Sequence, residues 1–301
     1  MPNWVKVHAP GKVNLALKVG AIGSDGFHPV ESVYQAVDLY DEIIATHSQR
    51  LELEMKGAGA KAAGTGSTNL AWRAAEALAK LAGIEPRVHL EIHKRIPIAG
   101  GMAGGSADAA GALVACDALW NLQTPRAQLL EIAASLGSDI PFSVVGGTEL
   151  GKGRGDVLTT LLARGEFHWV FALSSEGLST PAVYREFDRL NPEPAEPVVA
   201  PELIHALTAG DVQSAAKFLD NDLQEAALSL QPRLRRVLAA GREAGALAGI
   251  VSGSGPTCAF LAKSADHALD LAVELQAGGL VKRTVKASGP VRGAQVVEFE
   301  D

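Results

Sequence analysis

The sequence predicts an α+β fold divided into two domains. Helical and strand patterns are mixed along the whole chain, without the strict alternation that a doubly wound parallel sheet requires. The length of 301 residues suits one large domain or two of ordinary size. A charged, glycine-containing turn at 163–166 favours the second reading, with domains over residues 1–162 and 163–301.

The expected elements follow from local patterns. The stretch 88–93 alternates apolar and polar residues, which is typical of a half-buried strand. In the first half we expect strands over 4–8, 13–19 and 88–93, and helices over 69–81, 106–119 and 125–136. In the second half we expect strands over 169–173, 250–252 and 257–261, helices over 201–209, 213–227, 232–243 and 265–276, and a proline-rich surface loop over 191–197.

Composition limits the classes of function. The net charge is -7, whereas a general nucleic-acid binder is usually basic. An anionic ligand therefore needs a site made locally positive by backbone amides and a few cationic side chains. Cys116 and Cys258 lie far apart in apolar runs and show no zinc spacing, which favours a reducing cytoplasm. No apolar window reaches the length of about 18 residues that a membrane span needs.

A glycine-rich stretch over 96–110 predicts a phosphate cradle. Pro97 ends a strand, and the glycines after it leave backbone N–H groups uncovered. The helix expected from Ser106 adds free N–H groups and the positive end of its dipole. The Ser106 hydroxyl could then bind a phosphate or Mg²⁺. The alternative is a flexible loop with Ser106 as an N-cap, and Asp108 is expected to be a structural first-turn acid.

Two familiar nucleotide motifs are absent. The nearest match to a Walker A loop runs from Gly146 to Lys152, but Gly153 follows where a hydroxyl is needed. The glycines of the stretch 96–110 are in the wrong register for a dinucleotide fingerprint, and Asp117 comes too early. A dinucleotide-dependent oxidoreductase is therefore disfavoured.

Three separated blocks together resemble the GHMP kinase superfamily. They are residues 9–15 (APGKVNL), the glycine-rich stretch, and residues 252–260 (SGSGPTCAF). Further blocks at 24–28 (SDGFH), 31–33, 38–41 and 137–142 (GSDIPF) resemble one branch of it, whose members phosphorylate a polyol carrying a cytidine diphosphate group. The resemblance covers nearly the whole chain and is loosest between about 191 and 248.

The resemblance implies a two-domain GHMP-kinase-like fold with the active site in the interdomain cleft. It implies an N-terminal domain that binds ATP and Mg²⁺ and a C-terminal domain that binds substrate. The reaction would transfer the ATP γ-phosphate to the 2-hydroxyl of an erythritol unit, in the non-mevalonate route to isoprenoid precursors. The implied ATP contacts are Asn69, Pro97, Ile98, Ala99, Gly100, Gly101, Met102, Ala103, Gly104, Gly105, Ser106 and Ala107.

The loop departs from the family pattern at three positions. Ala99, Ala103 and Ala107 stand where the family more often has Gly, Gly and Ser. Small side chains keep the loop open, so the cradle should survive. A second hydroxyl contact from position 107 is absent. Asn69 also follows Ser67-Thr68 at a helix start, where capping explains it equally well.

Asp139 and Lys12 are the expected catalytic pair. Read alone, Gly137-Ser138-Asp139 is a turn whose carboxylate could be a cap, and Lys12 could be a solvated strand residue. The resemblance implies that Asp139 is the general base, and that Lys12 polarises the hydroxyl, keeps Asp139 ionised and offsets phosphoryl charge.

The implied substrate site draws on separate blocks. Asn14 shares a strand face with Lys12 and is expected to hydrogen-bond the substrate. Aromatic rings would stack on the cytosine, whose edge His28 would bind, although any aromatic read alone is more often core. The implied substrate contacts are Asn14, Phe27, His28, Thr180, Pro181, Tyr184, Gly253, Ser254 and Gly255.

Other functions remain in competition. Another small-molecule kinase of the superfamily, acting on homoserine or mevalonate, would have no use for the Phe27-His28 pair. A non-catalytic metabolite sensor on the same fold would not need both Lys12 and Asp139. The sequence leaves the oligomeric state open.

Overall fold

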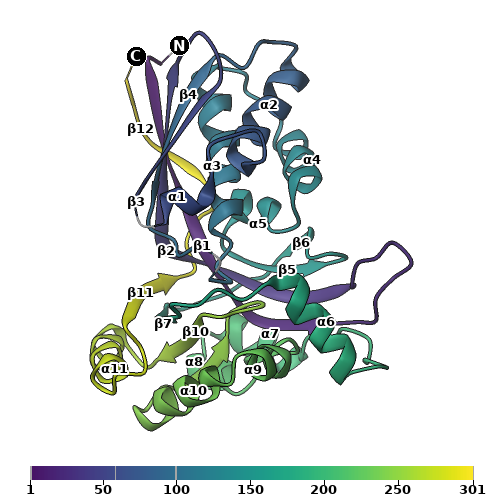
Figure 1. Ribbon diagram of the computed structural model, residues 1–301, viewed down its shortest axis with the longest axis vertical. Helices are drawn as coiled ribbons and strands as arrows, with labels where there is room; N and C mark the ends of the chain where they lie inside the picture. Colours follow the sequence, from purple (N-terminus) through teal and green to yellow (C-terminus); the bar gives the residue numbers. More distant parts are fainter. Residues whose placement is uncertain (1, 58, 99, 301) are drawn as a thin grey trace.

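The computed structural model describes residues 2–57, 59–98 and 100–300, and it confirms the α+β class. Figure 1 shows an upper unit, in which helices cover one face of a sheet, above a lower unit built on a second sheet. Most neighbouring strands are antiparallel. Within the described ranges, β3–β4 and β1–β8 are the parallel pairs.

The upper sheet has the strand order β12-β1-β2-β4-β3. β5 extends it by pairing with β2 and β6, and β8 pairs with the end of β1. The strands are β1 (Trp4–Val19), β2 (Val30–His47), β3 (Glu52–Gly57), β4 (Val88–Lys94), β5 (Thr148–Lys152), β6 (Val157–Thr160), β8 (Asp220–Asn221) and β12 (Gln295–Glu300). The upper helices are α1 (Ala60–Ala63), α2 (Leu70–Ala82), α3 (Gly104–Leu119), α4 (Arg126–Leu136) and α5 (Ile140–Val145).

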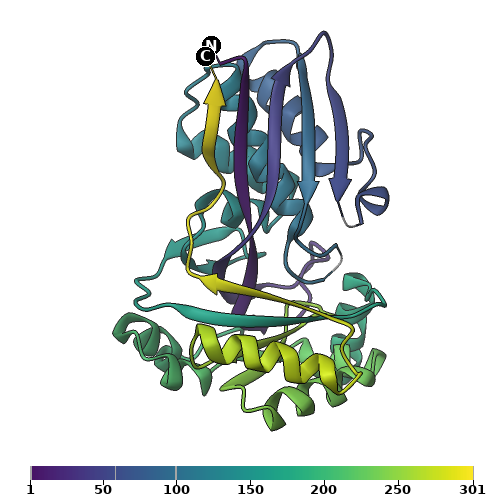
Figure 2. The same cartoon turned by 90° about the vertical axis from the view of Figure 1, so that its left-hand side faces the viewer.

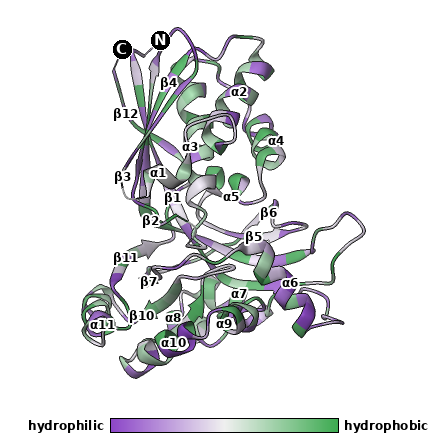
Figure 3. Cartoon of the chain, in the orientation of Figure 1, coloured by the Kyte–Doolittle hydropathy of each residue, from purple (hydrophilic) through white to green (hydrophobic). Residues whose placement is uncertain are grey.

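The lower sheet has the order β11-β7-β10-β9. Its strands are β7 (Phe167–Leu173), β9 (Ala248–Val251), β10 (Cys258–Ala262) and β11 (Arg283–Gly289). Its helices are α6 (Thr180–Leu190), α7 (Pro201–Ala209), α8 (Val212–Ala216), α9 (Gln224–Leu230), α10 (Arg233–Glu243) and α11 (Ala265–Ala277). In Figure 3, β10 is largely hydrophobic, whereas outward parts of α6 and α10 are hydrophilic, as expected for helices with one buried stripe.

Helix α3 is the central helix of the upper unit. Its Ala and Gly residues are buried almost all round, so it can approach the sheet closely. A Cβ added at Gly111 would lie 2.3 Å from the Ile43 side chain on β2. This close packing fixes the direction in which the first turn of α3 points.

Two predicted strands are joined and one predicted helix is broken in the structure. The stretches 4–8 and 13–19 form one continuous strand, β1, because residues 9–12 pair with β2 despite Pro10 and a register shift beside it. The helix expected over 213–227 is broken into α8, β8 and α9, because the backbone at Asp220 and Asn221 pairs with β1. The loop over 191–197 is confirmed.

The two chain ends lie together in the upper unit. Figure 2 shows β12 beside β1, and the two strands pair from Trp4 with Glu300 to His8 with Gln295. The boundary near residue 162 stays a proposal, and β12 belongs to the upper sheet although it lies in the second half of the sequence. No helix within the described ranges is long and apolar enough to cross a membrane.

Candidate functional site

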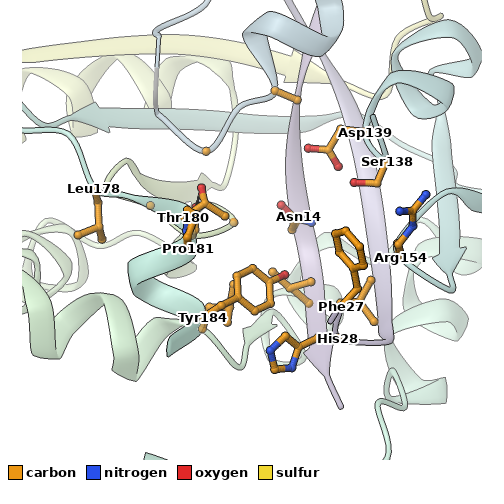
Figure 4. A pocket seen from close by; sticks show the side chains of 18 of the residues that line it. Asn14, Phe27, His28, Ser138, Asp139, Arg154, Leu178, Thr180, Pro181 and Tyr184 are labelled. Carbon is orange, nitrogen blue, oxygen red and sulfur yellow. Dashed lines mark hydrogen bonds between the residues drawn. The ribbon is translucent and has the colours of Figure 1, made fainter. Parts of the chain in front are cut away.

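A cavity of about 680 Å³ collects most of the predicted site residues. Such a volume suits a drug-sized ligand. Side chains reach it from β1, from the loop after β1, from the turn before α5 and from α6, and Figure 4 shows several of them. The predicted residues that line it are Lys12, Asn14, Phe27, His28, Pro97, Gly100, Gly101, Ala103, Gly104, Gly105, Asp139, Thr180, Pro181, Tyr184, Gly253, Ser254 and Gly255.

The glycine-rich loop ends in an uncapped helix start. α3 begins at Gly104, two residues earlier than predicted, so Ser106 lies inside the first turn and is not the N-cap. The N-cap is Ala103, in the left-handed conformation with φ of 57°, and among the described residues no side chain caps the helix. The first N–H groups of α3 are therefore available to an anion.

A second glycine turn packs against this loop. The Ser252 hydroxyl donates to the Gly101 carbonyl at 3.0 Å. A Cβ at Gly101 would lie 2.0 Å from the Ser252 carbonyl oxygen, so only glycine fits there. A Cβ at Gly253 would lie 3.5 Å from both Lys12 Nζ and Asn14 Oδ1. The three sequence blocks, far apart in the chain, thus meet at one place.

Lys12 and Asp139 face each other across this junction. Lys12 Nζ lies 3.9 Å from Asp139 Oδ2. The Lys12 side chain is 7% exposed and that of Asp139 is 34% exposed, so the acid is open to the cavity while the cation lies below it. The Asp139 side chain makes no capping bond to α5. The carboxylate is therefore free to accept a proton from a bound hydroxyl.

A hydrogen-bond chain holds Lys12 in place. Its ammonium donates to Asn14 Oδ1 at 2.6 Å, and Asn14 Nδ2 donates to the Ser32 hydroxyl at 2.8 Å. Ser32 donates in turn to the Ala16 carbonyl at 2.7 Å. The ring of Tyr34 lies 5.5 Å from the ammonium, within cation–π range. The cation is therefore oriented by β1 and β2 together.

Aromatic rings flank another part of the cavity. The ring centroids of His28 and Tyr184 are 5.0 Å apart, and Phe27 is 52% exposed. His28 Nδ1 lies 2.9 Å from the Gly20 carbonyl oxygen, which can only accept a hydrogen bond. Burial and the nearby Asp139 charge raise the pKa of Tyr184 to about 12, so its hydroxyl stays protonated.

A buried ionic cluster lies beneath the glycine-rich loop. Lys94 donates to Asp41, to Asp108 at 2.7 Å and to the Gly104 carbonyl at 3.1 Å. Asp41 also accepts from the backbone N–H of Ile96 at 2.9 Å. The cluster thus ties both ends of the loop to β2 and β4. Asp108 is structural as expected, but it lies beyond the first turn of α3 and binds Lys94.

Some predicted ATP contacts do not line the cavity. Met102 and Ala107 are fully buried in the core. Asn69 caps α2 by accepting from Ala71 N at 2.8 Å, and its amide donates to Gly64 O at 2.9 Å. Their role in nucleotide binding stays a prediction, as it does for Ile98 and Ser106, which also lie off the cavity wall. Ala99 falls outside the described residues.

The cavity also contains residues that sequence reasoning missed. Arg154, Arg185 and Asp188 line it, as does Tyr34. No local pattern distinguishes a turn arginine or a helix aspartate that faces a cavity from one that faces bulk water. The sequence signal at Arg154 is limited to its place between Gly153 and Gly155, which indicates a tight turn.

Comparisons with known proteins agree over almost the whole chain. Family models described as "GHMP kinases N terminal domain" and "GHMP kinases C terminal" match residues 69–147 and 203–279. A protein of Mycolicibacterium smegmatis is 53% identical over 97% of this chain and 92% of its own length. A protein of Streptomyces coelicolor is 54% identical over 98% of this chain and 99% of its own length. Both are named 4-diphosphocytidyl-2-C-methyl-D-erythritol kinase.

Solved structures show the same arrangement. A crystal structure of 4-(cytidine 5'-diphospho)-2C-methyl-D-erythritol kinase superimposes with a TM-score of 0.78 at 30% identity, over 94% of this chain and 98% of that chain. A homoserine kinase from Cytophaga hutchinsonii has a TM-score of 0.78 at 18% identity, covering 99% of this chain and 98% of that one. The second likeness concerns the fold alone.

Proposed function

The chain belongs to the GHMP kinase family, and from this membership we propose that it transfers the γ-phosphate of ATP to the 2-hydroxyl of 4-diphosphocytidyl-2-C-methyl-D-erythritol. The observation that carries the proposal is one cavity that contains both Lys12 with Asp139 and the aromatic group of Phe27, His28 and Tyr184. The first group suits phosphoryl transfer to an alcohol, and the second suits a nucleobase. The product would serve the non-mevalonate route to isoprenoid precursors.

The proton of the attacking hydroxyl passes to Asp139 in this proposal. The carboxylate is partly exposed and lies 3.9 Å from the Lys12 ammonium. Lys12 also lies next to the second glycine turn, where it can offset charge on the phosphoryl group in transit. Because both side chains are held by strand and turn backbone, catalysis rests on positioning and charge.

The triphosphate would lie on the uncapped start of α3. Gly100, Gly101, Gly104 and Gly105 line the cavity without side chains that block it. The N–H groups there, with the helix dipole, suit a phosphate anion in a chain whose net charge is -7.

Mg²⁺ is part of the proposal. Oxygen ligands fit a hard cation: the Ser106 hydroxyl, which follows the cavity-lining Gly105 but does not itself line the cavity, would bind the ion together with phosphate oxygens. When bound, the ion would neutralise charge on the β- and γ-phosphates. We also place the reaction in the cytoplasm, since Cys116 and Cys258 are buried free thiols that suit a reducing compartment.

The acceptor beside His28 supports cytosine over uracil. The Gly20 carbonyl can only accept, so His28 Nδ1 carries a proton and holds the ring in place. Asp188 Oδ1, a carboxylate oxygen that accepts hydrogen bonds, lies 3.5 Å from Nε2 of that ring. An acceptor in this position suits the exocyclic amine of cytosine and repels the carbonyl oxygen that uracil has in its place. Homoserine and mevalonate carry no nucleobase, so they would make no use of His28 and Asp188.

A substrate panel tests the proposed function. ADP release would be measured with 4-diphosphocytidyl-2-C-methyl-D-erythritol, its uridine analogue, the cytidine-free alcohol, homoserine and mevalonate. We expect the cytidine compound to give the largest kcat/KM, because remote contacts help to organise the reacting centre. Equal rates with and without the cytidylyl group would refute the substrate assignment. If the protein binds ATP but phosphorylates none of these alcohols, the alternative of a non-catalytic metabolite sensor is favoured.

A further inference from the structure

Arg154 is a cation of the cavity that the phosphoryl-transfer chemistry does not use. It lies in the turn 153–156 between β5 and β6, and it lines the same cavity as Asp139. Its guanidinium carbon lies 5.0 Å from the centroid of the Phe27 ring, within cation–π range. In Figure 4, Phe27 is drawn between Tyr184 and Arg154, and the guanidinium lies on the side of the cavity where Ser138 is. Arg154 therefore borders both the aromatic group and the transfer site.

The turn that carries Arg154 is held firmly against β2. The Gly153 carbonyl accepts from Val30 N at 2.8 Å, and Asp156 Oδ1 accepts from Arg154 N at 3.1 Å. A Cβ at Gly155 would lie 2.2 Å from the Tyr34 hydroxyl oxygen, so the turn backbone sits directly on that side chain. The Arg154 side chain thus extends from a turn whose backbone is fixed. β6 begins three residues after Arg154.

The guanidinium still has hydrogen-bond capacity to offer a ligand. Its ion pair with Asp156 is long, at 3.8 Å, and its side chain is 46% exposed. A guanidinium that stacks on a ring keeps its N–H donors in the plane of the group, directed away from that ring. Those donors match the geometry of phosphate oxygens.

The substrate proposed above defines what must lie near Arg154. Its base would stack on the aromatic group and its reacting hydroxyl would lie at Asp139, so the diphosphate that joins them must cross the space between. Lys12 is already bonded to Asn14 and paired with Asp139. Resting on that proposed function, we propose that Arg154 is a specificity-determining residue that binds the substrate's diphosphate, with its guanidinium held in place against Phe27.

The test compares Arg154→Gln, Arg154→Lys and the wild type. KM and kcat for the cytidine substrate, KM for ATP, and inhibition constants of CDP and of cytidine would be measured for each. Arg50→Gln is the control, since that side chain is 82% exposed and is paired with Glu52 on β3. Arg154→Gln should raise the substrate KM and the CDP inhibition constant roughly tenfold or more, with little change in kcat, in the ATP KM or in cytidine inhibition. For Arg154→Lys, the substrate KM and the CDP inhibition constant should lie between those of the wild type and Arg154→Gln, because lysine keeps the charge but cannot stack a planar group on Phe27.

Two results would overturn the assignment. One is an unchanged CDP inhibition constant in Arg154→Gln. The other is an equal loss for CDP and cytidine, which would mean that Arg154 acts only by supporting Phe27. Failure of the proposed function is separate, because it would appear as a wild type that binds CDP but does not turn over the cytidine substrate.

Discussion

Asp139 differs from the other acids of the cavity in having Lys12 beneath it and no capping bond to its own helix. Replacing Asp139 with Asn keeps the shape of the side chain and removes its ability to accept a proton. We expect kcat to fall roughly 10²- to 10⁴-fold. The affinity for ATP should remain, since Asn can still lie beside Lys12. Coupled ADP release and calorimetric ATP binding would measure the two quantities.

The control for this change is Asp270→Asn on the exposed face of α11, which should leave both quantities unaltered. A proton acceptor other than Asp139 would be indicated if the Asp139→Asn variant kept more than about a tenth of the wild-type kcat.

Residue types alone predicted little of this site. Lys12 and Asp139 are separated by more than a hundred positions, and each has an ordinary explanation when it is read by itself. Their pairing was expected only from the resemblance, and the structure places them 3.9 Å apart. The buried cluster of Lys94, Asp41 and Asp108 was not expected, because charged side chains are usually exposed to solvent unless they are paired.

At the scale of elements, the glycine-rich loop depends on backbone that tolerates no side chain. Gly101 has φ of 72°, and an added Cβ would meet the Ser252 carbonyl oxygen. Gly101→Ala should therefore lower the free energy of unfolding by about 1–3 kcal/mol. It should also raise the ATP KM, because the loop must move to relieve the clash. Urea unfolding and initial rates at varied ATP would measure both.

Gly278→Ala is the matched control for Gly101→Ala. Its Cβ would meet no atom within 4 Å, and its φ is -70°, so neither quantity should worsen. Equal behaviour of the two variants would show that the loop adapts to a side chain.

Helices were easier to predict than strands in this chain. α2, α4, α7, α10 and α11 match their expected ranges to within one or two residues, because a helix is stabilised by bonds within its own segment. β2 and β12 were not expected. β12 pairs with β1, which lies almost 300 positions away, and the local residue pattern of β12 does not identify its partner strand.

At the scale of the whole molecule, the buried cluster gives the unfolding free energy a pH dependence. Burial raises the pKa of Asp108 to about 8, against the lowering effect of Lys94. In the unfolded chain an aspartate titrates near about 3.9. Between these values the folded chain holds a proton that the unfolded chain has lost, so the contribution of Asp108 to stability falls as pH rises.

Asp108→Asn removes this proton uptake while keeping a neutral side chain of the same shape. We expect its unfolding free energy to fall less steeply than that of the wild type between pH 5 and pH 8. Urea titrations across this range would measure it, with the exposed Asp266→Asn as control. Parallel curves for Asp108→Asn and the wild type would show that Asp108 is ionised throughout.

The length of β1 and β2 has a consequence for movement. Both strands run through the upper unit and on toward the lower one, so a continuous two-stranded ribbon joins the halves (Figure 1). Because each strand of this ribbon is hydrogen-bonded to the other, an approach of the two halves would have to bend it. Lys12 and Asn14 lie near the middle of β1. Such a bend would therefore displace both side chains together with the strand that carries them.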